Sequence, residues 1–135
     1  MKFYIDENLM PSMADQLNRV FRGHNFRTPS QEHCRGLEDI ELFDHLQALS
    51  YDALITGARR QLERPDERQA LRKAGLSWLG IKTLSLSGAA QLATQTAIVL
   101  NGLAWTLDEW CEIPSIYRLH SPKSRNDFAA EIETV

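Results

Sequence analysis

The chain has 135 residues, of which 43% are hydrophobic and 24% are charged, and its formal net charge at pH 7 is −3. This length and composition predict one soluble globular domain spanning residues 1–135. The slightly negative charge excludes nucleic-acid binding through overall basicity, so any such contact must come from a local cluster of Arg and Lys.

Cysteine usage and hydropathy predict a cytoplasmic protein without membrane contact. Cys34 and Cys111 are far apart in sequence, which fits neither a disulfide framework nor a zinc site and is typical of a reducing compartment. The first residues lack the basic and apolar segments of a signal peptide. The most apolar stretch, residues 87–105, contains several polar side chains and is too polar to span a bilayer.

The first predicted element is a short strand over residues 1–5, where apolar and polar positions alternate. It ends in Asp6, Glu7 and Asn8, and Pro11 then suits the first turn of a helix. The carboxyl ends of strands in α/β sheets are ligand-binding positions, and a cation there would relieve the repulsion between adjacent carboxylates. The alternative is that these acids cap the following helix, and position alone leaves both interpretations open.

Hydrophobic spacing predicts the next elements. We expect a helix over residues 11–21 that ends at Gly23, a short strand over 24–28, a loop over 29–36 and a second helix over 38–49.

The first turn of the second helix is acidic, with Glu38, Asp39 and Glu41. The helix dipole alone favours acids at this position, but three in four residues also make a second candidate acidic site. If the acids only cap helices, Asp6 and Asp39 lie far apart. If they form one site, their carboxylates converge.

The third strand, residues 51–56, is followed by a basic segment over 58–73. Six positive charges there outnumber three acids, and they are carried by Arg59, Arg60, Arg64, Arg68, Arg72 and Lys73. Arg59 and Arg60 lie at the carboxyl end of a strand and are candidate contacts to a phosphate backbone. The alternative is a solvated helix face with intrahelical ion pairs, which we expect for Arg72 and Lys73.

The remaining predicted elements are a helix over 66–74, a strand over 76–84, a helix over 88–110 and a strand over 113–119. Pro114 predicts an edge position for that last strand. Residues 121–135 are polar and predict a loose tail or, through apolar residues at 128–132, a docking helix. Alternating strands and helices predict an α/β fold with a mostly parallel sheet of about five strands, flanked by helices.

Three segments resemble the PIN-like domains, in particular the small bacterial group allied to the VapC-type toxins. The first is Ile-Asp-Glu-Asn at residues 5–8, followed by Leu-Met-Pro-Ser and a helix. The second is Asp-Ile-Glu-Leu at 39–42, and the third is Leu-Ile-Thr-Gly at 54–57, followed by the arginine-rich residues 64–71. The resemblance covers residues 1–85.

The resemblance implies a PIN-like three-layer fold and a metal-dependent ribonuclease that uses Mg²⁺ or Mn²⁺. By matching position, it implies that Asp6 is the central metal ligand and Asp39 the second, with Glu7 and Glu41 as outer partners. Thr56 would orient a ligand or a water molecule. Hard cations of this kind take oxygen ligands and bridge carboxylates to phosphate oxygens.

The same resemblance implies the partners. Arg59, Arg60 and Arg64 would face an RNA substrate. The chain would be the toxin of a toxin–antitoxin pair, so an antitoxin protein is an expected partner. Apart from the resemblance, a homodimer is a further candidate assembly. The helix over 88–110, with its two tryptophans, is a candidate docking or dimer surface.

One position departs from the family pattern, which has an aspartate after the Thr-Gly strand end where this chain has Ala58. A methyl group cannot coordinate a cation, so two matched carboxylates remain and hydrolysis should be slow in this chain. Either Ala58 is natural, in a degenerate domain kept for binding RNA or a protein, or it is an engineered inactivation of a toxic ribonuclease. The sequence is consistent with both.

Overall fold

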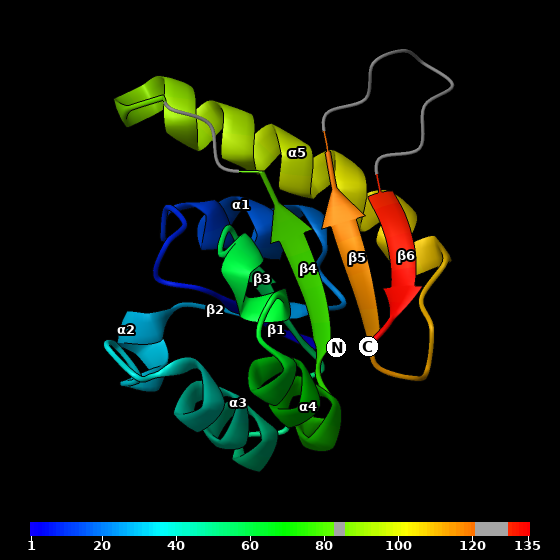
Figure 1. The fold of residues 1–135 in the computed structure, drawn as a ribbon. Helices are drawn as coiled ribbons and strands as arrows, with labels where there is room; N and C mark the ends of the chain where they lie inside the picture. Colours follow the sequence, from blue (N-terminus) through cyan, green and yellow to red (C-terminus); the bar gives the residue numbers. More distant parts are fainter. Residues whose placement is uncertain (83–85, 121–129) are drawn as a thin grey trace.

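The computed structural model describes residues 1–82, 86–120 and 130–135. Within these residues six strands form one sheet in the order β2-β1-β3-β4-β5-β6 (Figure 1). The strands are β1 (Lys2–Ile5), β2 (Asn25–Arg27), β3 (Ala53–Thr56), β4 (Ser77–Ile81), β5 (Ser115–Leu119) and β6 (Ala130–Thr134). The helices are α1 (Met13–Val20), α2 (Pro29–Glu32), α3 (Asp39–Ala48), the 3-10 helix η1 (Arg59–Leu62), α4 (Pro65–Ala74) and α5 (Gly88–Asp108).

The sheet is mostly parallel. Strands β1 to β5 pair in parallel, and β6 pairs antiparallel with β5. Parallel neighbours need crossover connections, and the helices between the strands supply them. The predicted α/β fold with a mostly parallel sheet flanked by helices is therefore confirmed, with six strands in the described residues instead of about five.

Helices cover both faces of the sheet: α1 and α5 lie on one face and α3 and α4 on the other (Figure 1). Strand side chains point alternately to the two faces, so Phe3 and Ile5 pack toward α1 and α5 while Tyr4 packs toward α3. No helix among the described residues is long and apolar enough to cross a membrane.

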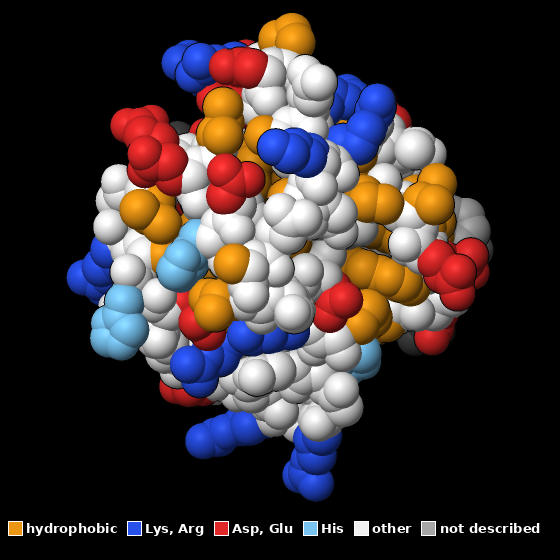
Figure 2. Space-filling model, turned by 90° about the horizontal axis from the view of Figure 1, so that it is seen from below, with side chains coloured by type: hydrophobic (Ala, Val, Ile, Leu, Met, Phe, Trp, Pro, Cys, Tyr) orange, Lys and Arg blue, Asp and Glu red, His pale blue; other side chains and the backbone are white. Residues whose placement is uncertain are grey.

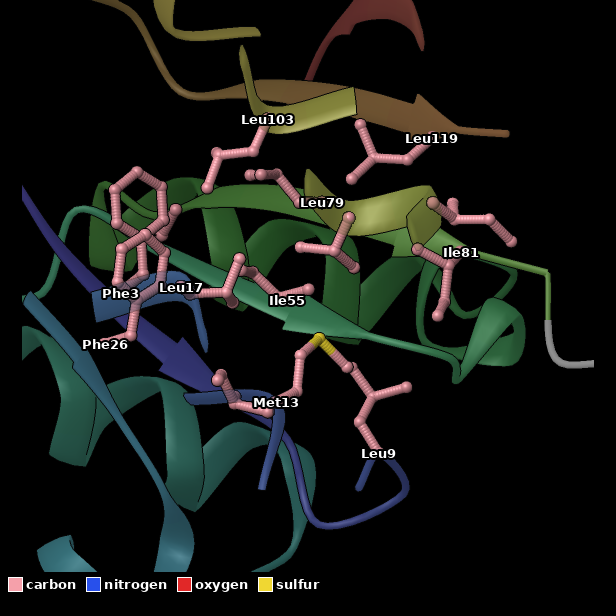
Figure 3. Close-up of a cluster of buried hydrophobic side chains, with 14 of the residues drawn as sticks. Phe3, Leu9, Met13, Leu17, Phe26, Ile55, Leu79, Ile81, Leu103 and Leu119 are labelled. Carbon is pink, nitrogen blue, oxygen red and sulfur yellow. The ribbon is translucent and has the colours of Figure 1, made fainter. Parts of the chain in front are cut away.

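The core under α1 and α5 is built from aromatic and branched aliphatic side chains (Figure 3). Phe3 stacks on Phe26 with a centroid separation of 5.0 Å. Trp110 stacks on Tyr117 and meets Phe3 edge to face, at 5.4 and 5.8 Å. Trp110 is half-buried and packs against this end of the core, beyond the C-terminal end of α5.

The segment over residues 29–36 was expected to be a loop, but it begins with the short helix α2. Thr28 and Gln31 form a capping box: the Gln31 side chain accepts from the backbone N–H of Thr28 over 3.0 Å. Pro29 occupies the first turn, where its missing N–H has no consequence. This capping pattern explains the helix.

The C-terminal expectations need two corrections. The strand expected at the edge is β5, which lies between β4 and β6. Pro114 lies just before β5, so it removes no N–H from the sheet. Residues 130–134 form the edge strand β6, with Ile132 opposite Tyr117, so a docking helix is wrong there. Residues 83–85, at the end of the strand expected over 76–84, and residues 121–129 of the expected tail lie outside the described residues.

Candidate active site

The carboxyl ends of β1 and β3 meet near the middle of the sheet. The two strands are parallel neighbours, with Ile5 opposite Ile55. Strand β2 lies on one side of β1 and strand β3 on the other, so the strand order reverses at β1. In α/β proteins, ligands bind at such a reversal, outside the carboxyl ends of the strands. Asp6 directly follows β1 and Thr56 ends β3, so both lie at this position.

Asp6 is 6% exposed and surrounded by hydrogen-bond donors. The Thr56 hydroxyl donates to its Oδ2 over 2.7 Å, and the Asn8 amide donates to the same oxygen over 3.2 Å. The backbone N–H of Glu7 donates to Oδ1 over 2.9 Å. Asp6 does not cap α1, whose N-cap residue is Ser12, so the capping interpretation is wrong for this acid.

Asn8 and Thr56 hold the two strand ends together. The Asn8 amide donates to Thr56 Oγ1 over 3.1 Å, and its oxygen accepts from the backbone N–H of Gly57 over 2.9 Å. The backbone N–H of Ala58 donates to Thr56 Oγ1 over 3.0 Å. These bonds fix the turn after β3, and with it the position where the family pattern has an aspartate.

Asp39 reaches the same place from the start of α3, where it is the first helical residue. Its Oδ1 accepts a hydrogen bond of 2.6 Å from the side-chain amide of Gln61, and that same nitrogen lies 3.5 Å from Asp6 Oδ2. Oxygen atoms of both carboxylates therefore lie within 3.5 Å of the same nitrogen atom. They converge, as a single site requires.

Trp78 fixes the orientation of the Gln61 amide. Its indole N–H donates to Gln61 Oε1 over 3.1 Å, and both side chains are buried. An indole can only donate, so the amide oxygen must face Trp78 and the NH₂ group must face the carboxylates.

A cavity of about 160 Å³ opens over the two acids. Ala58 and Glu7 lie on its wall, and the Glu7 carboxylate accepts from the backbone N–H of Gly36 over 3.2 Å. Glu41 is exposed on α3 and is not among the described residues that line the cavity. The lining consists of Tyr4, Asp6, Glu7, Asn8, Cys34, Leu37, Asp39, Leu42, Ala58 and Gln61.

Burial raises the pKa of Asp6 above its ordinary value. The hydrogen bonds from the Thr56 hydroxyl and from the Glu7 backbone lower this pKa, while the charges of Asp39 and Glu7 raise it further. Two facing carboxylates in a partly desolvated site repel each other, so a cation or an N–H donor between them is favourable.

A further acid near the site is Glu67, in the first turn of α4. It is 6% exposed, and its pKa is raised by burial and then by the charge of Asp39. Arg64 pairs with it over 2.9 Å and also with Asp66 over 3.2 Å. The charge of Arg64 is thus already engaged by acids of its own segment.

The other two candidate RNA contacts lie in η1. Arg60 is exposed, whereas the side chain of Arg59 lies outside what the structure describes. The face shown in Figure 2 carries acidic and basic side chains interspersed, and neither sign covers it. On this face a nucleic acid would meet local charges rather than one basic field.

The comparisons with known proteins decide the family. A profile of the PIN like domain matches residues 1–83, more than half of the chain. The chain belongs to the PIN-like domain family. No curated protein and no solved structure gives a significant match.

The matched part of this PIN-like domain contains β1, α3 and β3, which carry Asp6, Asp39 and Thr56. Members of the family often bind metal, and the donors here suit a small divalent cation. Mg²⁺ takes oxygen ligands, keeps several waters and often uses one or two carboxylates. The cavity is far larger than the roughly 10–15 Å³ that one water needs. Among the described residues, no group of three His, Cys, Asp or Glu side chains forms a metal site.

Sequence reasoning missed the roles of Asn8, Gln61 and Trp78 in this PIN-like site. Asn8 belongs to the Asp-Glu-Asn motif, so its position was a usable signal. Gln61 lies in an arginine-rich stretch that resembles a solvated surface, and Trp78 resembles an ordinary core residue. Their contact depends on tertiary structure and left no pattern in the sequence.

Proposed function

We propose that this PIN-like domain is a divalent-cation-dependent endoribonuclease, and that Ala58 weakens its activity in this chain. The observation that carries the proposal is the convergence of Asp6 and Asp39 in one cavity at the carboxyl edge of the sheet. Membership of the PIN-like family supports nuclease chemistry at that edge.

The residues of the chain have distinct roles in this proposal. Asp6 and Asp39 hold the cation through their carboxylate oxygens, and Thr56 fixes the orientation of Asp6 by donating to it. Bound Mg²⁺ or Mn²⁺ supplies Lewis acidity, which lowers the pKa of a water and neutralises charge on the phosphate. Arg60, exposed at the same edge, attracts the RNA backbone.

The experiment restores the missing carboxylate. We expect the Ala58→Asp variant to cleave single-stranded RNA about a hundredfold faster than the unchanged chain in Mn²⁺ or Mg²⁺. A cation of this kind contributes several kcal/mol of transition-state stabilisation, and each 1.4 kcal/mol is about tenfold in rate. Cleavage rates of a mixed-sequence RNA are read on denaturing gels.

Two controls test the assignment. Ala58→Asn has nearly the same shape as Ala58→Asp but no charge, so it should not gain cleavage. Adding Asp6→Ala to Ala58→Asp should abolish the gain. The proposal fails if the Ala58→Asp chain cuts none of the RNA, or if its cleavage survives the loss of Asp6.

A second function is favoured by Ala58 itself, whose methyl group lies on the cavity wall where the family has an acid. In this alternative, the domain binds RNA or a protein without cleaving it. RNA binding by the unchanged chain that weakens with salt, together with no cleavage by Ala58→Asp, would favour this alternative.

The proposal extends to a VapC-like toxin held inactive by an antitoxin. The support is the resemblance of residues 1–85 to that bacterial group. We expect induced expression of the Ala58→Asp chain to arrest bacterial growth, and the Ala58→Asn chain to leave growth unchanged. Growth curves after induction provide the measurement.

A further inference from the structure

The NH₂ group of Gln61 lies between the two carboxylates that would hold a cation. It donates to Asp39 over 2.6 Å and lies 3.5 Å from Asp6 Oδ2. Gln61 is 4% exposed, and the Trp78 indole holds its oxygen away from both acids. The side chain therefore presents hydrogens, and not an oxygen, to the carboxylate pair.

We propose that Gln61 acts as an internal competitor of the divalent cation and thereby limits the cation affinity of this site. The amide relieves part of the repulsion between Asp6 and Asp39 that would otherwise favour cation binding. A cation can take this position only if the Gln61–Asp39 hydrogen bond breaks and the amide leaves or turns. Turning the oxygen toward the cation would break its bond to Trp78.

This inference rests on the proposed function, because it assumes that Asp6 and Asp39 can hold a cation. It adds a cause of weak binding that is independent of Ala58. Ala58 removes a charged ligand, whereas Gln61 places hydrogen-bond donors where the cation would be. Reversing either cause alone should therefore increase the affinity for the cation.

The test is a titration of the full chain with Mn²⁺ alone, in which electron paramagnetic resonance measures the free ion. Gln61→Ala removes the amide, and Gln61→Glu replaces its NH₂ group with an oxygen of a third carboxylate. We expect both variants to bind Mn²⁺ about ten- to a hundredfold more tightly than the unchanged chain, which is the range that partners of metal ligands commonly control.

The matched control is Gln69→Glu, which makes the same charge change at an exposed position of α4 and should leave Mn²⁺ affinity unchanged. Thermal unfolding is followed in parallel. Without Mn²⁺, Gln61→Glu should melt at a lower temperature because three carboxylates then converge, and Mn²⁺ should reverse that loss. If Gln61→Glu does not fold, Gln61→Ala decides the question.

Two results overturn the inference in distinguishable ways. If Ala58→Asp binds Mn²⁺ while Gln61→Ala binds no better than the unchanged chain, Gln61 does not compete and the cation site stands. If the Ala58→Asp and Gln61 variants all fail to bind Mn²⁺, the proposed function fails with the inference.

Discussion

Glu32 connects α2 to the sheet through two hydrogen bonds to one oxygen. The Tyr51 hydroxyl donates to Glu32 Oε1 over 2.6 Å, and Arg27 Nε donates to it over 2.8 Å. The Tyr51 bond is the main cause that lowers the pKa of Glu32, and Arg27 lowers it further against the opposing effect of burial. The ionised form of Glu32 therefore stabilises the folded chain.

Because folding lowers the pKa of Glu32, its stabilising effect is present above the unfolded pKa of about 4.3 and is lost as pH falls through the folded value. We expect Glu32→Gln to reduce the free energy of unfolding by about 1 kcal/mol at pH 7, and this difference to shrink as the pH falls below about 4. Urea unfolding of both chains at a series of pH values measures this difference in the free energy of unfolding. The exposed Glu112→Gln serves as the control, and an equal pH dependence for both variants would contradict the prediction.

At this scale the sequence predicted the acids of the site better than its amides. Asp6 directly follows a strand and Asp39 begins a helix. In a parallel α/β sheet, the carboxyl ends of the strands and the starts of the connecting helices lie at the same edge. Gln61 contacts residues of three other segments, so no local spacing reveals its role. The loss of a ligand at Ala58 was visible only against a family pattern.

Strand β4 depends on a glycine. Trp78 and Gly80 are two residues apart and face the same side of the sheet. A Cβ added at Gly80 would overlap the six-membered ring of Trp78. The ring thus lies over the glycine, and this packing places the indole N–H against Gln61.

We expect Gly80→Ala to destabilise the fold by about 1–3 kcal/mol, because the added methyl must displace a buried ring in a packed core. Urea unfolding measures the loss. Gly23→Ala is the matched control, since nothing lies within 4 Å of a Cβ there, and its stability should remain close to that of the unchanged chain. Equal stability of the two variants would show that the Trp78 ring can move without cost.

Among the elements, the helices α1, α3, α4 and α5 and the strands β1 to β5 were predictable, whereas α2, η1 and β6 were not. The second helix was expected over 38–49 and is α3, Asp39–Ala48. The four residues of α2 are too few to show a helical period, and the local signals were its capping box and Pro29 in the first turn. Strand β6 alternates Glu131, Ile132 and Glu133, but charged residues hide this pattern.

For the whole molecule, the sheet order predicts which backbone amides are most protected from hydrogen exchange. Strands β1, β3 and β4 have a partner on each side and helices over both faces, whereas β2 and β6 are edges. We expect amide hydrogens of β1, β3 and β4 to exchange slowest with solvent, and those of β6 to exchange earlier. Native-state exchange followed by NMR tests this. Protection of β6 equal to that of β3 would contradict it.

The interior position of β1 also bears on the order of folding. This strand comes first along the chain, yet its partner β3 lies about fifty residues later, and Asp6 bonds Thr56 across that span. Bringing such distant segments together costs loop entropy and slows folding. Until β3 docks on β1, Asp6 lacks the hydrogen bond from Thr56 and the contact with Gln61. The carboxylate pair therefore cannot assemble ahead of the central sheet.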